Sequence, residues 1–393
     1  MTAQVLLIFH PRFEESSDML KGIMHEQRTH GRWSVSLHDE ARPGVDPCCW
    51  VRGRRWHGVI SRNTTPDLVE TCSRAGVPLA DLADTPPAPG VAKVRPDNHA
   101  IGRLGAAYFL ERRFTSFAFT GYSGHNWSRE RRDGFRDSLA RGRHRCDVLE
   151  VEQPDDLTPA WDARQIAALA GWLRSLPTGT AIMGCDDQRA HQVVRAARAT
   201  GLQVPDEIAV LGANNQSMRC ELADPSISSI AINAFEAGRR AAVHLEQMIA
   251  GTASVPVDER IAPLGVVTRK STDVMGARDP AVAAALAYIR EHACRGLTVD
   301  EILAQVSISR SQLEHKLRRY IGRSPQVEIR RVQVARVCEL LTETTLPLKE
   351  IAHQTGFTHV EYLSVVFKRI TGDTPGQYRT KHTQSFERPW MIA

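Results

Sequence analysis

The sequence predicts an α/β domain of two lobes, followed by an all-α domain with two helix-turn-helix subdomains. Short apolar runs of strand length alternate with amphipathic helical stretches as far as Met275. Beyond that residue no strand-like run of any length is found, and two similar helix-turn-helix patterns follow. The charge divides at the same place, because 33 Lys and Arg balance 33 Asp and Glu through Met275, whereas 17 against 12 follow it. The whole net charge of +5 therefore lies in the all-α part.

Several classes of protein are excluded by composition. The 393 residues contain no run near the ~18 apolar residues that a membrane-spanning helix needs. The amino terminus has no basic segment before an apolar one and no small-residue cleavage site, so a signal peptide is not expected. The eight cysteines are scattered without C-x-x-C pairs, which is typical of reduced thiols in a cytoplasm. Adjacent Cys48 and Cys49 lack His or Cys partners at zinc-site spacing, so no metal is expected. We therefore expect a cytoplasmic protein without a membrane segment.

The α/β part is predicted from two sets of segments that alternate along the chain. The apolar runs of strand length are Val5–Phe9, Val35–Leu37, Gly58–Ile60, Val77–Leu79, Val91–Val94, Ser116–Thr120, Ala181–Met183, Ile208–Leu211 and Ser229–Ile232. The helical patterns are Glu15–His30, Asn98–Arg112, Arg129–Arg141, Ala163–Leu176, Asp187–Thr200 and Ala234–Ile249. This alternation is typical of a parallel sheet with helices on both faces, and the length suits two such lobes.

Polar and aromatic residues follow the predicted strands. Parallel α/β sheets bind ligands beyond the carboxyl ends of their strands, so these residues are candidates for a binding site. Their mixture of carboxylates, amides, arginines and rings suits a polyhydroxylated ligand. From this set we select as ligand-binding candidates Arg12, Asp97, Trp127, Asp186 and Asn214. Each of them alone is also explained as a loop polar group or a helix cap, and Asp97 and Asp187 both precede helical patterns.

Three segments resemble the sugar-responsive regulators related to LacI and GalR and the periplasmic sugar-binding proteins. Glu130–Phe135 is similar to their R-x-x-G-F element, while Cys185–Gln188 and Val210–Asn215 are similar to two later elements. The resemblance implies a periplasmic-binding-protein-like sensor whose contacts to sugar hydroxyls come from Arg131, Asp186 and Asn214. Asn214 stands where the family usually has aspartate. An amide both donates and accepts, so we expect a different pattern of hydroxyls to be read there.

A polar break separates the two parts of the chain. LacI-type regulators carry their DNA-binding helices before the first strand, whereas this chain begins its first strand at Val5, so any DNA-binding part is expected elsewhere. The break is formed by Lys270–Asp273 and Gly276–Pro280, and a helix is predicted after it over Ala281–Cys294.

Two helix-turn-helix patterns follow this helix. The first begins at a capping box, Thr298 to Glu301, and has a second cap at Ser309. The helix after Ser309 places on one face Leu313, Leu317 and Ile321. The second pattern consists of Leu348–Ala352, Gly356-Phe357 and a helix over Thr358–Ile370, and the two patterns are joined by Gln326–Leu341. Either pattern alone is also explained as a plain helical hairpin.

The second pattern carries a specific resemblance. The run Leu348–Phe357, followed by Glu361–Leu363 and Gly372–Pro375, closely resembles the AraC/XylS family signature. The chain has Tyr362-Leu363 where the family has a tyrosine and a phenylalanine. The resemblance implies two helix-turn-helix subdomains joined by one long helix. Such subdomains enter successive major-groove segments on one face of DNA, about one helical turn (~34 Å) apart.

Matching positions to that family gives the DNA-binding candidates. In the first recognition helix the base-reading candidates are Arg310, Ser311, Glu314 and His315. In the second they are His359, Val360, Glu361, Ser364 and Val365. Arginine is suited to guanine, glutamate to the cytosine amino group, and valine either to thymine methyl groups or merely to packing. Phosphate contacts are expected from Lys316, Arg318, Arg319, Lys368 and Arg369.

The two resemblances together imply domains over 1–272 and 285–384 with a linker over 273–284. The interdomain region from Ser271 to Gly296 resembles that of bacterial xylose-operon regulators. We therefore predict a sugar-responsive, sequence-specific DNA-binding activator of a pentose operon. The expected partners are operator DNA, a sugar effector with D-xylose leading, RNA polymerase and a second copy of the chain. The alternatives are a different small ligand, or a sugar-binding module that reads no DNA.

An enzyme is the rival class. Asp186 and Asp187 form a carboxylate pair of the kind used for general acid and base catalysis. Adjacent residues at one helix start rarely converge on one reacting bond, however, and the sequence shows no nucleophile, phosphate loop or metal motif. We therefore expect neither catalysis nor a cofactor.

Overall fold

A computed structural model describes residues 3–9, 14–30, 33–38, 46–83, 88–153, 158–252, 257–273, 280–321, 323–344 and 346–383. The chain divides into two compact units, Met1–Asp273 and Val274–Ala393. The first helix of the second unit begins at Pro280, within the interval 273–284 that we predicted as a linker. The domain limits 1–272 and 285–384 stay predictions. The predicted ligand residue Arg12 lies outside the described residues.

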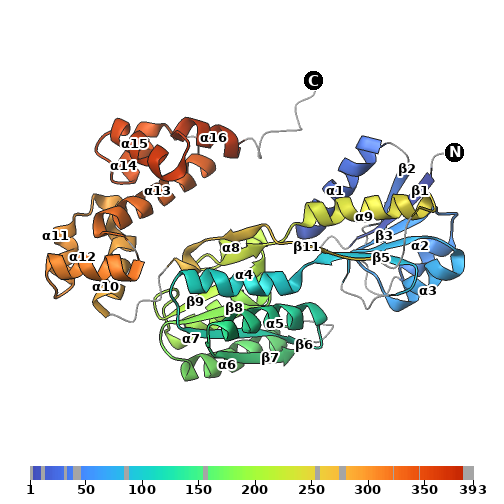
Figure 1. Ribbon diagram of the computed structural model, residues 1–393, viewed down its shortest axis with the longest axis horizontal. Helices are drawn as coiled ribbons and strands as arrows, with labels where there is room; N and C mark the ends of the chain where they lie inside the picture. Colours follow the sequence, from blue (N-terminus) through green and yellow to red (C-terminus); the bar gives the residue numbers. More distant parts are fainter. Residues whose placement is uncertain are drawn as a thin grey trace. The chain divides into compact units, whose positions relative to one another are not determined.

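The first lobe is a six-stranded parallel sheet with the order β11-β5-β4-β3-β1-β2. Its strands are β1 (Ala3–Ile8), β2 (Trp33–His38), β3 (Gly58–Ser61), β4 (Leu79–Asp81), β5 (Val91–Pro96) and β11 (Val257–Ile261). Its helices are α1 (Glu14–His30), α2 (Cys48–Arg52), α3 (Pro66–Ala75) and α9 (Ala234–Ile249). Alternate residues of β1 face opposite sides: Val5 and Leu7 join the core under α1 and α9, while Leu6 and Ile8 join the core under α2 and α3. Figure 1 shows the two helix layers on either side of the sheet.

The second lobe is a six-stranded sheet with the order β12-β10-β9-β8-β6-β7, in which only β12 is antiparallel to its neighbour. Its strands are β6 (Ser116–Ser123), β7 (Cys146–Glu152), β8 (Thr180–Gly184), β9 (Ile208–Asn214), β10 (Ser228–Ala231) and β12 (Gly265–Val267). Its helices are α4 (Asn98–Glu111), α5 (Asn126–Arg141), α6 (Pro159–Ser175), α7 (Asp187–Thr200) and α8 (Ser217–Leu222).

The chain passes three times between the lobes, from β5 to α4, from β10 to α9 and from β11 to β12. These crossings lie side by side in the middle of the first unit (Figure 1). A short 3-10 helix, η1 (Lys270–Thr272), closes the unit after β12. The carboxyl ends of the parallel strands of each lobe thus lie near the crossings, where a ligand would contact both lobes.

The second unit is all-helical, with α10 (Pro280–His292), η2 (Ala293–Arg295), α11 (Val299–Gln305), α12 (Arg310–Ile321), α13 (Pro325–Glu343), α14 (Leu348–Gln354), α15 (Val360–Thr371) and α16 (Pro375–Thr383). It has two cores. The first is built on α10, α11 and α12, and the second on α14 and α15. Helix α13 supplies Ile329 to the first core and Val337 to the second, so it joins the two subdomains as the sequence predicted.

The predicted fold class is confirmed, and the capping box at Thr298 and Glu301 is present with both of its hydrogen bonds. Two details were wrong. We predicted a strand over 77–79, but the Val77 amide donates to the Cys72 carbonyl in the cap of α3, and the strand begins at Leu79. Strands β7, β11 and β12 were not predicted. No helix among the described residues is long and apolar enough to cross a membrane.

Candidate functional site

The R-x-x-G-F element lies on α5, and its glycine explains how Arg131 is positioned. A Cβ added at Gly134 would lie 2.1 Å from the His99 carbonyl oxygen, and one added at Gly102 would lie 2.0 Å from the Arg131 carbonyl oxygen. Both distances are far shorter than a van der Waals contact, so these two glycines are what allows α4 and α5 to pack backbone against backbone. This packing holds Arg131 at the carboxyl ends of β6, β8 and β9.

Arg131 is almost fully buried, with 4% of its surface exposed, and it binds three different segments. Its Nε donates to Asn98 Oδ1 at 2.9 Å, Nη1 to the Cys185 carbonyl at 2.7 Å and Nη2 to Asn214 Oδ1 at 2.9 Å. Burial lowers the pKa of Arg131, while Asp186 and Asp187 nearby favour its charged form. A guanidinium has five N–H groups. The three bonds among the described residues therefore leave two N–H groups for a ligand oxygen.

Aromatic rings stand beside this guanidinium. The Trp127 ring centroid lies 5.2 Å from Arg131 Cζ, and the Tyr122 ring lies 6.1 Å from the Trp127 ring. Tyr122 is fully buried, burial raises the pKa of its hydroxyl, and that hydroxyl has no hydrogen-bond partner among the described residues. Nη2 of buried Arg189, on α7, is likewise without a partner there. Two orphaned polar groups beside rings are what a site for a hydroxylated ligand or ordered water provides.

Three carboxylates lie at helix starts around the cluster, and one expectation about them was wrong. Asp97 caps α4 by accepting from the Ala100 amide at 2.8 Å, as the sequence indicated. The cap of α7 is Asp186, which accepts from the Arg189 amide at 2.7 Å, and not Asp187. Burial raises the pKa of both Asp186 and Asp187, that of Asp187 to about 7. The pair therefore has one member that caps a helix and one that is buried in a structural network, an arrangement unlike a catalytic dyad.

Asn214 begins a short stretch, Asn214–Met218, that we call the junction segment. Asn214 and Asn215 have positive φ angles of 102° and 53°, a region in which asparagine is one of the few side chains to be found. The Asn215 amide donates to Ser229 Oγ at 2.9 Å, and the Gln216 amide donates to Asp187 Oδ2 at 2.7 Å. The junction segment is thus anchored to β10 and α7 of its own lobe, in addition to its bond with Arg131.

The junction segment is also tied to the other lobe, through Glu14 at the start of α1. The Glu14 carboxylate accepts from the Ser217 amide at 2.7 Å, from Ser217 Oγ at 2.9 Å and from the Met218 amide at 3.2 Å. Glu14 was not among the predicted residues. No local pattern marks Glu14, because its partners lie 203 and 204 residues away in the chain.

Of the six predicted ligand residues, four surround one point in the second lobe, namely Trp127, Arg131, Asp186 and Asn214. Asp97 lies near this cluster, because the next residue in the chain, Asn98, accepts a hydrogen bond from Arg131. Asn98 and Tyr122 belong to the set of residues that follow the predicted strands, but we did not select them as ligand-binding candidates. Among the described residues no group of three His, Cys, Asp or Glu side chains lies together to hold a metal ion.

Helix α12 presents its polar face to solvent in the second unit. Leu313 and Leu317 are buried, whereas Arg310, Ser311, His315, Arg318 and Arg319 are exposed. Arg310 pairs with Asp300 at 2.8 Å, and Arg318 approaches Glu314 at 3.7 Å. These pairs are largely exposed, so they hold the side chains weakly and DNA groups can replace them.

Helix α15 also presents a polar face to solvent, and its two candidate valines differ in exposure. Val365 is 64% exposed, while Val360 packs against the second core, so Val365 is the valine on the open face. Exposed neighbours of Val365 are His359, Glu361, Lys368 and Arg369. Ser364 donates its hydroxyl to the Val360 carbonyl at 2.9 Å within the helix. The predicted DNA-binding residues of both recognition helices thus lie mostly on solvent-exposed faces.

Two family matches cover the two units. Residues 106–272 match the periplasmic binding protein-like domain family, and residues 302–381 match a helix-turn-helix domain family. The first match falls in the α/β unit and the second spans both helix-turn-helix subdomains.

Relatives and a solved structure match nearly the whole chain. The xylose operon regulatory proteins of Escherichia coli K12 and Haemophilus influenzae are each 27% identical to it, over 97% and 96% of this chain and 98% of each relative. The solved structure of the xylose-binding transcription activator XylR is 27% identical with a TM-score of 0.72, over 98% of this chain and 99% of that one. The predictions of a regulator and against an enzyme are confirmed. The chain is a transcription regulator in which a periplasmic-binding-protein-like domain precedes a DNA-binding helix-turn-helix domain.

Proposed function

We propose that the protein is a cytoplasmic activator of a pentose-utilisation operon, that D-xylose is its effector, and that it binds its operator as a homodimer and contacts RNA polymerase there. The observation that supports this most is the cluster around Arg131, in which a buried guanidinium, a tryptophan ring and a capping carboxylate meet. A ring stacks on the C–H face of a sugar, and the charged groups bind its hydroxyls. The end-to-end match to xylose-operon regulators supports the pentose.

The sugar acts in this proposal by favouring one arrangement of the two lobes. A ligand shifts an equilibrium only through its different affinity for the two states. Trp127, Arg131, Asp186 and Asn214 supply contacts from the second lobe, and further contacts are predicted from Arg12 and Asp97. Closure of the lobes then alters the part of the chain that leads to the DNA-binding domain. We propose that this domain spans residues 285–384.

Isothermal titration with a panel of pentoses and hexoses tests the effector. We expect heat of binding with D-xylose and less or none with hexoses, because a hexose carries an extra hydroxymethyl group that the site must hold. Because Asn214 stands where the family usually has aspartate, the titration also determines which pentose the protein prefers. Absence of heat with every sugar would contradict the sugar proposal and leave the DNA-binding assignment intact.

Loss of the lobe-to-lobe contact should weaken sugar binding. Glu14→Ala removes an acceptor for three donors on the junction segment, so it destabilises the arrangement in which the lobes are bridged. We expect the Kd for D-xylose to rise about fivefold, since hydrogen bonds to a charged group at an exposed site contribute roughly 1 kcal/mol in total. The control is Asp18→Ala on the same helix, because Asp18 is exposed and pairs with Lys21. Equal Kd values for the two variants would contradict the role of Glu14.

Arg310→Ala should reduce sequence discrimination. Its guanidinium is suited to guanine O6 and N7, so the variant should bind a duplex selected by the wild-type protein about 10- to 100-fold more weakly. Binding to random duplex DNA should fall by no more than about threefold. Arg336→Ala on α13, where the arginine pairs with Glu339, is the control. A loss of the same size on both duplexes would show that Arg310 contacts phosphate instead.

A further inference from the structure

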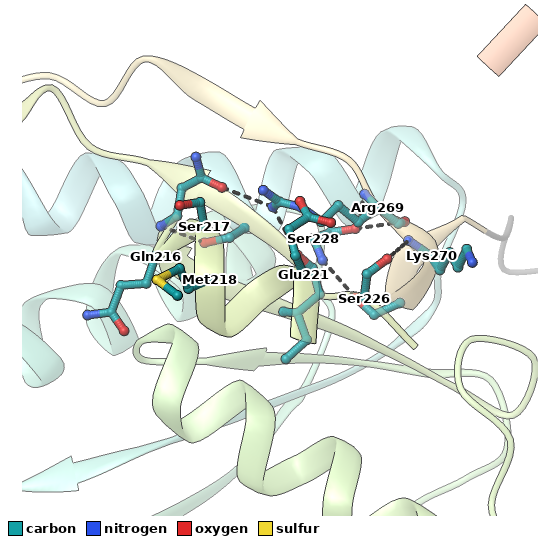
Figure 2. Close-up of polar contacts among 12 residues, drawn as sticks. Gln216, Ser217, Met218, Glu221, Ser226, Ser228, Arg269 and Lys270 are labelled. Atoms are coloured by element: carbon teal, nitrogen blue, oxygen red, sulfur yellow. Dashed lines mark hydrogen bonds and ion pairs between the residues drawn. The ribbon is translucent and has the colours of Figure 1, made fainter. Parts of the chain in front are cut away.

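The last residues of the first unit are fastened to the junction segment by Arg269 (Figure 2). Arg269 Nη1 donates to Asn215 Oδ1 at 2.9 Å and to the Ile227 carbonyl at 3.1 Å. Its Nε forms an ion pair with Glu221 on α8, and the Arg269 side chain is 11% exposed. The Arg269 guanidinium therefore joins three segments: the turn at Asn214 and Asn215, the residue Ile227 just before β10, and helix α8. Arg269 and Asn215 are 54 residues apart in the sequence.

The backbone after Arg269 is fixed as firmly as its side chain. Ser228 Oγ accepts from the Arg269 amide at 2.7 Å and donates to the Arg269 carbonyl at 3.0 Å. Ser271 Oγ donates to the Val210 carbonyl at 2.6 Å, and Thr272 Oγ1 bonds both Ser228 Oγ and the Tyr108 hydroxyl at 2.6 Å. Ser271 and Thr272 are fully buried. Residues 269–272 thus move with β9 and β10, and the chain runs from there through 274–279 into α10.

The turn at Asn214 and Asn215 lies between two arginines. Arg131, in the candidate sugar site, donates to Asn214 Oδ1 at 2.9 Å. Arg269, near the end of the first unit, donates to Asn215 Oδ1 at 2.9 Å. Both asparagines have positive φ, and two such residues in succession persist only where their surroundings determine the conformation. A sugar hydroxyl that donates to Asn214 Oδ1 competes with the bond from Arg131 to the same oxygen. Loss of the bond from Arg131 removes one of the contacts that hold the turn, which contains both Asn214 and Asn215.

We propose that Arg269 is a positioning residue that couples the sugar-bound state of the turn to the segment entering the DNA-binding domain. The inference rests on the proposed sugar function and deepens it. In the proposed change Arg269 loses its hydrogen bond to Asn215 and keeps its ion pair with Glu221. In this proposal the guanidinium has two arrangements, one bonded to Asn215, Glu221 and the Ile227 carbonyl and one that keeps Glu221 and the Ile227 carbonyl without Asn215, and the sugar selects between them.

The test uses the full chain with two single variants and their combination. Arg269→Ala removes the guanidinium. Asn215→Gly removes the amide from the other end of the same contact, and glycine adopts the positive φ of 53° without strain. Arg198→Ala is the matched control, since Arg198 is a lobe-two arginine with 78% of its side chain exposed. For each protein we would measure the melting temperature, the Kd for D-xylose by titration, and the Kd for a selected duplex with and without saturating D-xylose.

Both single variants should bind D-xylose and sugar-free DNA within about threefold of the wild-type protein, while the effect of D-xylose on DNA affinity falls at least about fivefold. The double variant should lose no more than either single variant, because both remove one contact. An undiminished sugar effect in Arg269→Ala or Asn215→Gly would overturn the inference alone. So would a parallel fall in melting temperature and sugar affinity in both variants, which marks a structural role. A wild-type protein that gives no heat with D-xylose or any other sugar overturns the proposed function and the coupling with it.

Discussion

Arg131→Met is expected to reduce the affinity for D-xylose by at least about 100-fold, the largest effect that we predict for the sensor. The guanidinium is buried and holds Asn98, the Cys185 carbonyl and Asn214. Methionine fills similar space but donates no hydrogen bond, so it leaves those acceptors unpaired and supplies nothing to a sugar hydroxyl. The measurement is isothermal titration of the full chain with D-xylose.

The matched control is Arg136→Met on the same helix. Arg136 is exposed and lies away from the buried face that Arg131 occupies. We expect this control to bind D-xylose with wild-type affinity. The melting temperature of Arg131→Met should be measured alongside, because three unpaired acceptors also destabilise the lobe. Wild-type sugar affinity in Arg131→Met would show that the sugar binds elsewhere.

Val365→Glu is expected to lower the affinity for duplex DNA by at least about 100-fold, with the fold unchanged. Val365 is 64% exposed on α15, so the substitution removes no core contact. A carboxylate there repels phosphate, and it also pairs with Lys368 one turn along the helix and so withdraws a cation from the DNA. Fluorescence anisotropy with a selected duplex at fixed salt measures the loss.

Val327→Glu introduces the same charge at another exposed valine of the second unit, which is 51% exposed on α13. It should change DNA affinity by no more than about threefold. If the two variants weakened binding equally, the loss would reflect overall charge, and α15 would not be a recognition helix.

Local signals account for the parts of the fold that the sequence predicts well. The limits Asp187–Thr200 and Ala234–Ile249 agree with α7 and α9, because a polar cap and a continuous apolar face mark each helix. The capping box at Thr298 is predicted for the same reason. Strand β11 has no such signal: Val257–Ile261 carries charged residues, and its partner β5 lies more than 160 residues earlier in the chain.

The residues of the candidate site likewise include some that local sequence patterns predict and some that they do not. The R-x-x-G-F pattern locates Arg131, and the structure adds the reason for its glycine, which is the close packing of α5 on α4. The capping roles were assigned to the wrong member of the Asp186 and Asp187 pair, since sequence spacing does not distinguish a cap from the residue after it. Glu14 and Arg269 were not found at all, because their contacts join segments that only the folded chain brings together.

The affinity of the full chain for a selected duplex, measured with and without saturating D-xylose, shows whether the sugar controls DNA binding. A sugar-responsive regulator must bind DNA with different affinity in its two effector states. We expect D-xylose to change the Kd for the duplex at least about fivefold, and hexoses to change it by less. Heat of binding for D-xylose together with an unchanged DNA Kd would contradict the account.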